Sequence, residues 1–288
     1  FKQKTAYEIM PSLVGSEMCI RDRSGFDSLE ECFLDMAPHV CAVETGLSSD
    51  PAMNWNISEL DGRTIVSFSD AHSLANLGRE ATVFQGRLSY RGLAQALATQ
   101  GVAYTIEFHP EVGKYHFSGH RKCGVWQGVR EAVDSAGLCP VCGRALTQGV
   151  MHRVAGLSHC DAPAGLPKNL DAAGLIPSPR GRPPFMRLVP LVEIIAQTLR
   201  YSITSKRVQN EYLRLVDELG SEFTILVQTP FGDLAHVGGE NLAQTVMMVR
   251  AGRVRVDPGY DGVYGSVSPV SYTHLRAHET RHDLVCRL

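Results

Sequence analysis

The sequence lacks several features that would place it in a familiar class at once. No apolar run reaches the roughly 18 to 20 residues that a membrane-spanning helix requires, and the first residues lack the basic-then-apolar order of a secretion signal. No G-x-x-x-x-G-K-[ST] phosphate loop occurs, which excludes that way of binding a nucleotide. Charge is nearly balanced, with 28 Lys and Arg against 30 Asp and Glu. Any affinity for DNA must therefore come from local basic groups, and we expect a soluble, cytoplasmic protein.

Size and cysteine content favour a globular, metal-binding protein. The chain has 288 residues and 44% hydrophobic residues, enough for one large domain or two ordinary ones. Its eight cysteines are unevenly distributed, and the tightest group contains a Cys-x-x-Cys pair. In a cytosolic protein such a pair indicates a metal before a disulfide.

The two ends differ from the middle. Residues 1–23 and about 268–288 resemble translated sequencing-adapter tails, so we exclude them from fold reasoning. This exclusion removes Cys19 and Cys286 from the possible metal ligands. It also removes the histidine series His274, His278 and His282, whose i, i+4, i+8 spacing is typical of a metal site on a helix. We assign this series no role.

The remaining chain alternates helical and β-rich patterns, which predicts an α/β sheet or barrel. Helices are expected at 27–36 and 90–99, and strands at 41–44, 64–68 and 104–108. The pattern opens within a domain, so we expect an N-terminal part to be missing. A loop-rich section then leads into a linker rich in Pro and Gly, 161–184.

A second domain is expected after the linker. Helices are predicted at 191–199 and 205–219, the latter with Ser205 as N-cap and Gly220 as its C-terminal stop. A strand is predicted at 223–227, a helix at 240–250 and a strand at 253–256, followed by the glycine-rich turn DPGYDGVYG.

Four residues in the centre predict a structural zinc site. His120-x-x-Cys123 and Cys139-x-x-Cys142 form two ligand pairs separated by fifteen residues, and Pro140 and Gly143 favour a tight turn in the second pair. Four protein ligands close the tetrahedral shell and leave no position for substrate water, so the metal should be structural.

Other interpretations of this zinc site stay open. His116, His152 or Cys160 are alternatives to His120 as the fourth ligand, and the cysteines alone also fit free thiols or a redox pair. Basic residues surround the site, which lets it present cations to a phosphate backbone or simply gives it a solvated surface. They are Lys114, Arg121, Lys122 and Arg130.

Asp70 and His72 follow the predicted strand TIVSF, and alternate side chains there face the same way. A carboxylate and an imidazole at the carboxyl end of a barrel strand are ligands that a hydrolytic metal site uses. An isolated Asp-x-His also fits a turn-capping aspartate beside a surface histidine. Glu44, at the end of its own strand, lies near the same edge, but we do not assign it as a ligand.

Six ordered motifs together resemble endonuclease Q. They are GLSSDPAMNW at 46–55, SFSDAHS at 67–73, LGREA at 77–81, EFHPEVGKYHFSGHRKCG at 107–124, LCPVCGRALTQGVMHRV at 138–154 and VDPGYDGVYG at 256–265. The resemblance covers essentially all of residues 24–267. Members of that family are nucleases of the polymerase-and-histidinol-phosphatase (PHP) type, in which a metal-dependent barrel precedes a zinc element and a C-terminal domain.

The resemblance implies a fold and a domain order for this chain. We expect the C-terminal part of a PHP-type (β/α) barrel at 24–112 and a zinc-binding element at 113–160. A linker at 161–187 and a smaller α+β, DNA-handling domain at 188–267 should follow.

The resemblance also implies a DNA repair endonuclease that cleaves 5′ of deaminated bases (uracil, hypoxanthine, xanthine) or abasic sites. Asp70 and His72 then match the last motif that binds the catalytic divalent ions (Mg2+, Mn2+ or Zn2+). The earlier His-x-His has no counterpart here, so we expect an incomplete and inactive catalytic centre.

Contacts with DNA are expected at two kinds of residue. Phosphate contacts are predicted at Arg79, Lys114, Arg121, Lys206 and Arg207. The turn 257–265 is a candidate base pocket, in which Tyr260 or Tyr264 stacks on a flipped base and Asp261 accepts from its edge. An ordinary glycine-rich turn with packed tyrosines explains the same residues.

Two further functions remain open. A PHP-type phosphatase of a small phosphorylated metabolite would carry the same Asp70 and His72, although the zinc site and the basic stretch after Gly113 argue against it. A non-catalytic zinc-ribbon module that binds DNA is the other alternative.

Overall fold

The computed structural model describes residues 26–269 except 87, 159–169, 172–173 and 179. Residues 1–23, residues 270–288 with the histidine series 274–282, and Cys160 lie outside the described residues. The described chain forms two compact units. The first runs to Arg187 and also takes in Asp257–Ser266, and the second comprises Leu188–Val256 and the chain from Val267. The first boundary lies between Arg187 and Leu188, and the glycine-rich turn groups with the first unit.

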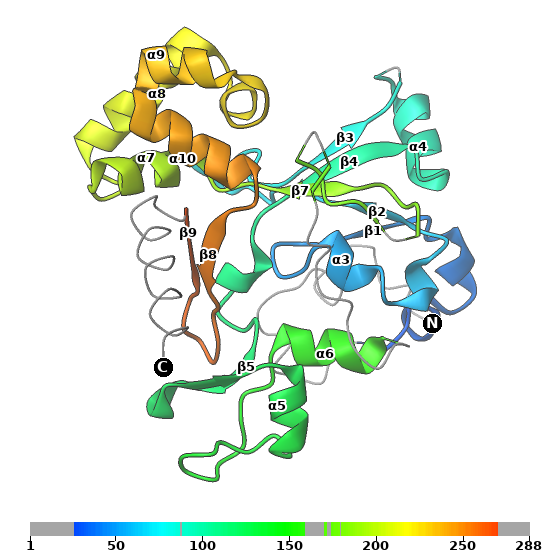
Figure 1. The fold of residues 1–288 in the computed structure, drawn as a ribbon. Helices are drawn as coiled ribbons and strands as arrows, with labels where there is room; N and C mark the ends of the chain where they lie inside the picture. The colour runs from blue at the N-terminus through cyan, green and yellow to red at the C-terminus, as the bar shows by residue number, and fades with distance from the viewer. Residues whose placement is uncertain (1–25, 87, 159–169, 172–173, 179, 270–288) are drawn as a thin grey trace, which may run out of the picture. The chain divides into compact units, whose positions relative to one another are not determined.

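Three short sheets build the first unit (Figure 1). Strand β1 (Ala42–Glu44) pairs in parallel with β2 (Thr64–Val66). Strand β4 (Val102–Glu107) lies between the antiparallel β3 (Ala81–Phe84) and the parallel β7 (Phe185–Arg187). Strands β5 (Ser118–His120) and β6 (Val125–Gln127) form an antiparallel pair. The described part of this unit is therefore a mixed α/β structure.

Short helices connect these strands, and three of them, α2, α3 and α4, begin at a side-chain cap. They are α2 (Leu29–Phe33), η1 (Leu34–His39), α3 (Pro51–Asn54), η2 (Ser58–Leu60), η3 (Leu74–Asn76), α4 (Tyr90–Ala98), η4 (Pro110–Val112), η5 (Arg121–Cys123), α5 (Val129–Asp134) and α6 (Val150–Leu157). Asp50 caps α3 by accepting from the Met53 N–H at 2.9 Å, and Ser89 caps α4 in the same way through Gly92. A buried cluster joins α3 to the sheets, with the Trp55 ring edge-on to Phe185 at 5.5 Å.

The second unit is mainly helical. It contains α7 (Leu191–Leu199), α8 (Lys206–Leu219), η6 (Thr224–Gln228), α9 (Phe231–Gly238) and α10 (Glu240–Arg250), followed by β8 (Val254–Asp257), which pairs with β9 (Ser266–Pro269). The helices pack around fully buried aliphatic side chains, among them Ile194, Val208 and Leu234. Ser205 caps α8 and Gly220 ends it, as the sequence predicts.

The strand predicted at 223–227 is wrong, because Phe223 is helical and residues 224–227 lie in the π-helix η6. A short apolar run buried on both sides fits a strand or a helix equally well. Two contacts select the helix. Ser221 accepts from the Thr224 N–H, and the Arg250 guanidinium donates to the Ile225 and Leu226 carbonyls, both at 2.7 Å. Nowhere in the described residues is a helix long and apolar enough to span a membrane.

Candidate metal sites and nucleic-acid contacts

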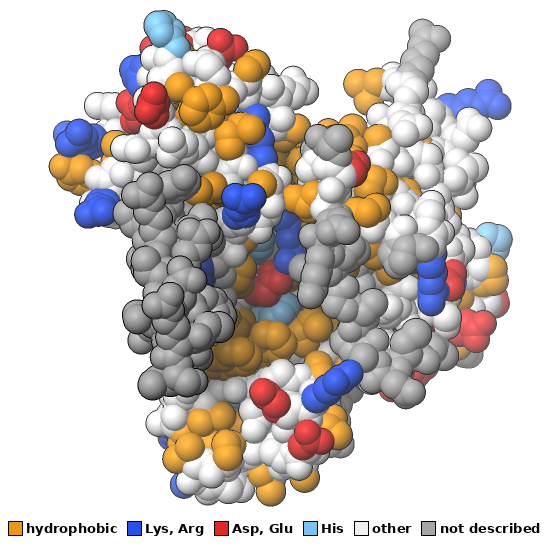
Figure 2. All heavy atoms as spheres, in the orientation of Figure 1, with side chains coloured by type: hydrophobic (Ala, Val, Ile, Leu, Met, Phe, Trp, Pro, Cys, Tyr) orange, Lys and Arg blue, Asp and Glu red, His pale blue; other side chains and the backbone are white. Residues whose placement is uncertain are grey.

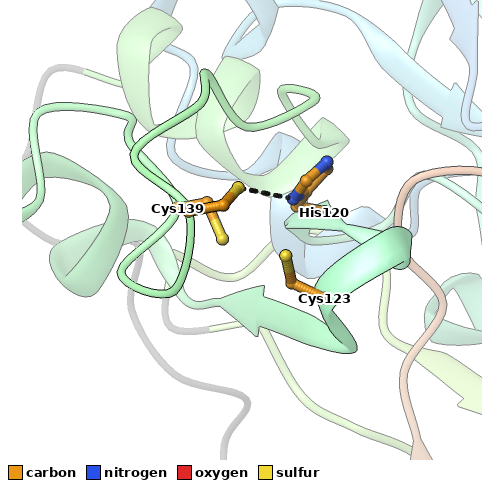
Figure 3. A group of neighbouring side chains, drawn as sticks. His120, Cys123 and Cys139 are labelled. Atoms are coloured by element: carbon orange, nitrogen blue, oxygen red, sulfur yellow. Dashed lines mark hydrogen bonds between the residues drawn. The ribbon is translucent and has the colours of Figure 1, made fainter.

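Four side chains converge at the tips of two hairpin-like turns. His120 ends β5, Cys123 ends η5, and Cys139 and Cys142 lie on the loop after α5. Their donor atoms all lie within 4.8 Å of one another, and Figure 3 shows His120, Cys123 and Cys139 pointing toward one another. Cys142 Sγ and His120 Nδ1 are 3.3 Å apart. We call this group the Cys/His cluster.

The local backbone explains why the four residues meet. Each ligand pair is followed by a glycine in the left-handed region, Gly124 at φ 65° and Gly143 at φ 70°, a conformation that a side chain with a Cβ rarely adopts. The Gly143 N–H donates to the Cys139 carbonyl at 2.8 Å and closes the second turn. The two turns therefore place two pairs of donors opposite each other.

The chemistry of the donors fits a zinc ion. Three sulfur atoms and one imidazole are a common structural zinc set, and ligands of a tetrahedral ion with bonds of about 2.3 Å lie within the separation seen here. Burial acts to raise the pKa of Cys139, but hydrogen bonds from the Cys142 and Val141 N–H groups outweigh it and lower that pKa to about 6. A thiolate is the form that binds metal. Neither His116 nor His152 belongs to this cluster.

Asp70 and His72 lie in an exposed loop just after β2. Asp70 has a left-handed backbone at φ 45°, and its carbonyl oxygen is 2.9 Å from His72 Nδ1. Burial of the Glu44 carboxyl, and secondly the charge of Asp70, raises the pKa of Glu44. The two carboxylates are thus within electrostatic range of each other. Within the described residues, the Cys/His cluster alone brings three or more donors into reach of one ion.

Sequence reasoning missed a pair of buried glutamates that both contact Ser67. Ser67 Oγ is 3.0 Å from Oε2 of Glu80 and 3.0 Å from Oε2 of Glu107. One hydroxyl has one hydrogen, so it donates to only one of them, and the second contact requires a protonated carboxyl. Burial is the main cause that raises the pKa of each glutamate to about 8. A glutamate is usually exposed, so sequence gives no signal for this pair.

Comparisons with known proteins agree with this architecture. A family model described as the MJ0043 C-terminal domain matches residues 190–253. Protein MJ0043 of Methanocaldococcus jannaschii is 30% identical over 253 residues, which cover 84% of this chain and 30% of that protein. Protein YqxK of Bacillus subtilis is 28% identical over 233 residues, which cover 79% of this chain and 52% of that protein.

Two solved structures share the fold. The lesion-specific endonuclease PfuEndoQ from Pyrococcus furiosus superposes with a TM-score of 0.71 at 27% identity, over 88% of this chain and 62% of that one. This chain resembles endonuclease Q. An endonuclease Q bound to a 27-mer duplex with an abasic lesion gives a TM-score of 0.68 at 28% identity, over 85% of this chain and 59% of that one. The chain thus spans less than two thirds of each of these relatives.

The residues predicted to contact phosphates differ in their exposure and in the contacts that their side chains already make within the protein. Lys206 and Arg207 are exposed at the start of α8, and the Arg207 guanidinium lies 5.0 Å from the Tyr201 ring. Arg79 donates to Asn76 and lies over the Phe108 ring. Lys and Arg side chains are scattered over the face drawn in Figure 2 and do not form one patch.

The turn 257–265 contacts residues next to the Cys/His cluster. Asp261 accepts from the Arg121 N–H at 2.8 Å and from the Thr147 hydroxyl at 2.6 Å, so both its carboxylate oxygens have partners inside the protein. The Tyr260 ring lies against Gly119, where a Cβ would come within 2.6 Å of it. Tyr264 is 66% exposed, with Lys114 Nζ 5.5 Å from its ring. Tyr264 is the member of the predicted base pocket that remains open to a ligand.

Proposed function

We propose that this chain is part of a metal-dependent DNA repair endonuclease that works in the cytoplasm. Its substrate would be the phosphodiester 5′ of a deaminated base or an abasic site. The observation that carries the proposal is the similarity to a lesion-specific endonuclease over 88% of the chain. The endonuclease Q complex with an abasic duplex supports DNA as the partner.

Asp70 and His72 are the proposed ligands of the catalytic divalent ions. A bound divalent ion supplies metal-activated water and neutralises negative charge on the phosphate. If the Nδ1–H of His72 donates to the Asp70 carbonyl, Nε2 keeps its lone pair for a ligand. Asp70 and Glu44 add negative charge at the same exposed edge. Two assigned donors are too few to hold such an ion firmly, so we expect this chain to be inactive.

The Cys/His cluster is the proposed structural zinc site, and it supports the DNA-binding surface without taking part in cleavage. Its four protein donors leave no open position for substrate. Arg121, inside the first ligand pair, presents its backbone N–H to Asp261 and leaves its side chain exposed. Lys114, Arg121, Lys206, Arg207 and Arg79 remain the proposed phosphate contacts, and Tyr264 the proposed stacking residue.

The test combines cleavage and binding on the same oligonucleotides. With Mn2+ or Mg2+ and duplexes containing a single uracil or abasic site, we expect binding to lesion DNA in preference to undamaged DNA, but no nicking. Robust nicking would overturn the expected inactivity. Equal binding to lesion and undamaged duplexes would overturn the assignment to lesion repair and favour the alternative of a zinc module that binds DNA without regard to damage.

A further inference from the structure

Two arginines that belong to neither metal site share one carboxylate in the first unit. Asp61 follows η2, and Arg180 and Arg182 lie in the segment before β7. Arg180 Nη1 donates to both carboxylate oxygens of Asp61, at 3.1 and 3.2 Å. Arg182 Nη1 lies 3.9 Å from Asp61 Oδ1. We call these three residues the Arg/Asp cluster.

The backbone holds the two arginines in place. Ile176 and Phe185 exchange two backbone hydrogen bonds, at 2.6 and 3.2 Å, and so close the loop that carries both arginines. Gly181, between them, has a left-handed backbone at φ 69°, which glycine adopts without strain. The turn in this loop is therefore built into the sequence Arg-Gly-Arg.

Arg182 is buried, and one of its nitrogens lacks a partner. The residue is 9% exposed, and its Nη2 donates to the Leu60 carbonyl at 2.8 Å and to the Arg63 carbonyl at 2.9 Å. Nη1 has no hydrogen-bond partner among the described residues, since 3.9 Å to Asp61 is too long. Burial is the main cause that lowers the pKa of Arg182, and the charge of Asp61 does not offset it. A buried charged donor without an acceptor is costly.

Positive charge is in excess around this cluster. Arg63, two residues after Asp61, gives its guanidinium to three backbone carbonyls, those of Ala37, Val40 and Glu59. The Glu59 carboxylate accepts from the Leu29 N–H at 2.7 Å. Among the described residues, Asp61 is therefore the one carboxylate bonded to these three arginines. A site of this kind attracts an anion.

The geometry favours a phosphate group as that anion. A guanidinium presents its N–H groups in a planar fork that matches phosphate oxygens. Arg180 uses only Nη1 in its pair with Asp61, and its side chain is 47% exposed. A tetrahedral phosphate can therefore accept from the remaining N–H groups of Arg180 with one oxygen and from Arg182 Nη1 with another. A water molecule would supply the bond to Nη1 but would not offset the charge.

We propose that the Arg/Asp cluster binds a phosphate group, through Arg182 Nη1–H and the remaining N–H groups of Arg180. A free phosphate ion and a phosphate of a nucleic-acid strand present the same oxygens to it. Asp61 is a positioning residue for Arg180, and its negative charge limits the affinity for the anion. The cluster shares no residue with the Cys/His cluster or with Asp70 and His72, so the proposal stands apart from the proposed function.

The first experiment compares melting temperatures of the full 288-residue chain in inorganic phosphate and in chloride at the same ionic strength. A ligand of the folded state raises the melting temperature, and the general effect of phosphate ions on stability is common to all variants. We expect phosphate to give the unmodified protein a higher melting temperature than chloride does. In R180Q the phosphate concentration needed for the same gain should rise by about tenfold, because one charged donor is lost.

Three further variants separate binding from folding. In R182K the lysine keeps the charge and can donate to the Leu60 and Arg63 carbonyls, but it lacks a second nitrogen, so most of the gain should be lost. D61N removes the competing negative charge and should enlarge the gain. R153Q is the matched control, because Arg153 is another half-exposed arginine that pairs with an aspartate, Asp27. It should keep the full gain.

Oligonucleotides distinguish the two sources of phosphate. Single strands with a 5′-phosphate or a 5′-hydroxyl are titrated into the unmodified protein and R180Q, and binding is followed by fluorescence anisotropy. Weaker binding of either strand by R180Q assigns the site to nucleic acid. Unchanged strand binding, with the gain from inorganic phosphate lost, assigns it to the free ion. Phosphate gains and strand affinities that are equal in the unmodified protein, R180Q and R182K would overturn the proposal, as would an equal loss in R153Q and R180Q.

Discussion

Gly149 is a residue whose missing side chain is needed for packing. It precedes α6, and a Cβ at this position would lie 2.3 Å from the Phe117 carbonyl carbon and 2.6 Å from the Ser118 nitrogen. Both are backbone atoms next to the Cys/His cluster, so they cannot move aside like the end of a flexible side chain. We predict that G149A lowers the free energy of unfolding by about 2 kcal/mol or more, measured by urea denaturation.

A matched control lies within α6 itself. A Cβ on Gly156 would meet no atom within 4 Å, and the backbone there is ordinary helix. G156A should raise the free energy of unfolding by roughly 0.5–1 kcal/mol, because alanine loses less backbone entropy in a helix than glycine does. If G149A proves as harmless as G156A, the close approach of α6 to Phe117 is not present in solution.

At the scale of elements, Glu80 and Glu107 join three strands through Ser67. Glu80 precedes β3, Glu107 ends β4, and Ser67 follows β2. The folded pKa of each glutamate is about 8, mainly through burial, whereas the ordinary value is about 4.5. The folded state therefore holds more protons than the unfolded state between these values.

This difference predicts a stability that falls as pH rises. The contribution of the two protonated glutamates to the free energy of unfolding is fully present below about pH 4.5. It is lost as pH rises through about 8, with a total change of a few kcal/mol. In E80Q the amide stays neutral and can donate like a protonated acid, so the slope of unfolding free energy against pH should flatten. E30Q, at an exposed glutamate, should keep the slope. Equal slopes in E80Q and the unmodified protein would mean that the pair does not hold a proton.

Local chemistry made some elements predictable from sequence and left others ambiguous. Helix α7 and helix α10 have the predicted bounds, and α8 begins one residue later, because apolar periodicity and the Ser205 cap act within the segment itself. The run at 223–227 carried no such signal, and its π-helix depends on Arg250, 25 residues away. Local pattern cannot supply a partner at that distance.

Some residues of the candidate sites were likewise predictable from local sequence, and others were not. The four residues of the Cys/His cluster were predictable because two ligand pairs with a fixed spacing and a following glycine encode their own turns. Asp261 was predicted to face a base, but its partners, Arg121 and Thr147, are more than a hundred residues away. The contact between Arg187 and Glu111 joins residues 76 positions apart and depends on β7, which ends at Arg187.

At the scale of the whole molecule, the two units have separate cores, and among the described residues only the first contains the Cys/His cluster. The turn 257–265 is tied to that cluster, since Asp261 accepts from the backbone N–H of Arg121 between two of the donors. Structural zinc supplies much of the folding energy of a small metal-binding element. If the Cys/His cluster holds the proposed zinc ion, its removal should therefore loosen both 118–147 and 257–265.

We predict that a strong chelator, or the C142S substitution, raises amide hydrogen exchange in 118–147 and 257–265 by at least about tenfold. Exchange in α7 and α8 should stay nearly unchanged, because the fully buried Leu191, Ile195 and Leu215 belong to the other core. C41S, at an exposed cysteine outside the cluster, is the matched control and should leave every segment unaffected. A parallel rise in α7 and α8 would show instead that one cooperative core spans the chain, and an unchanged 257–265 would show that the turn holds its place without the metal.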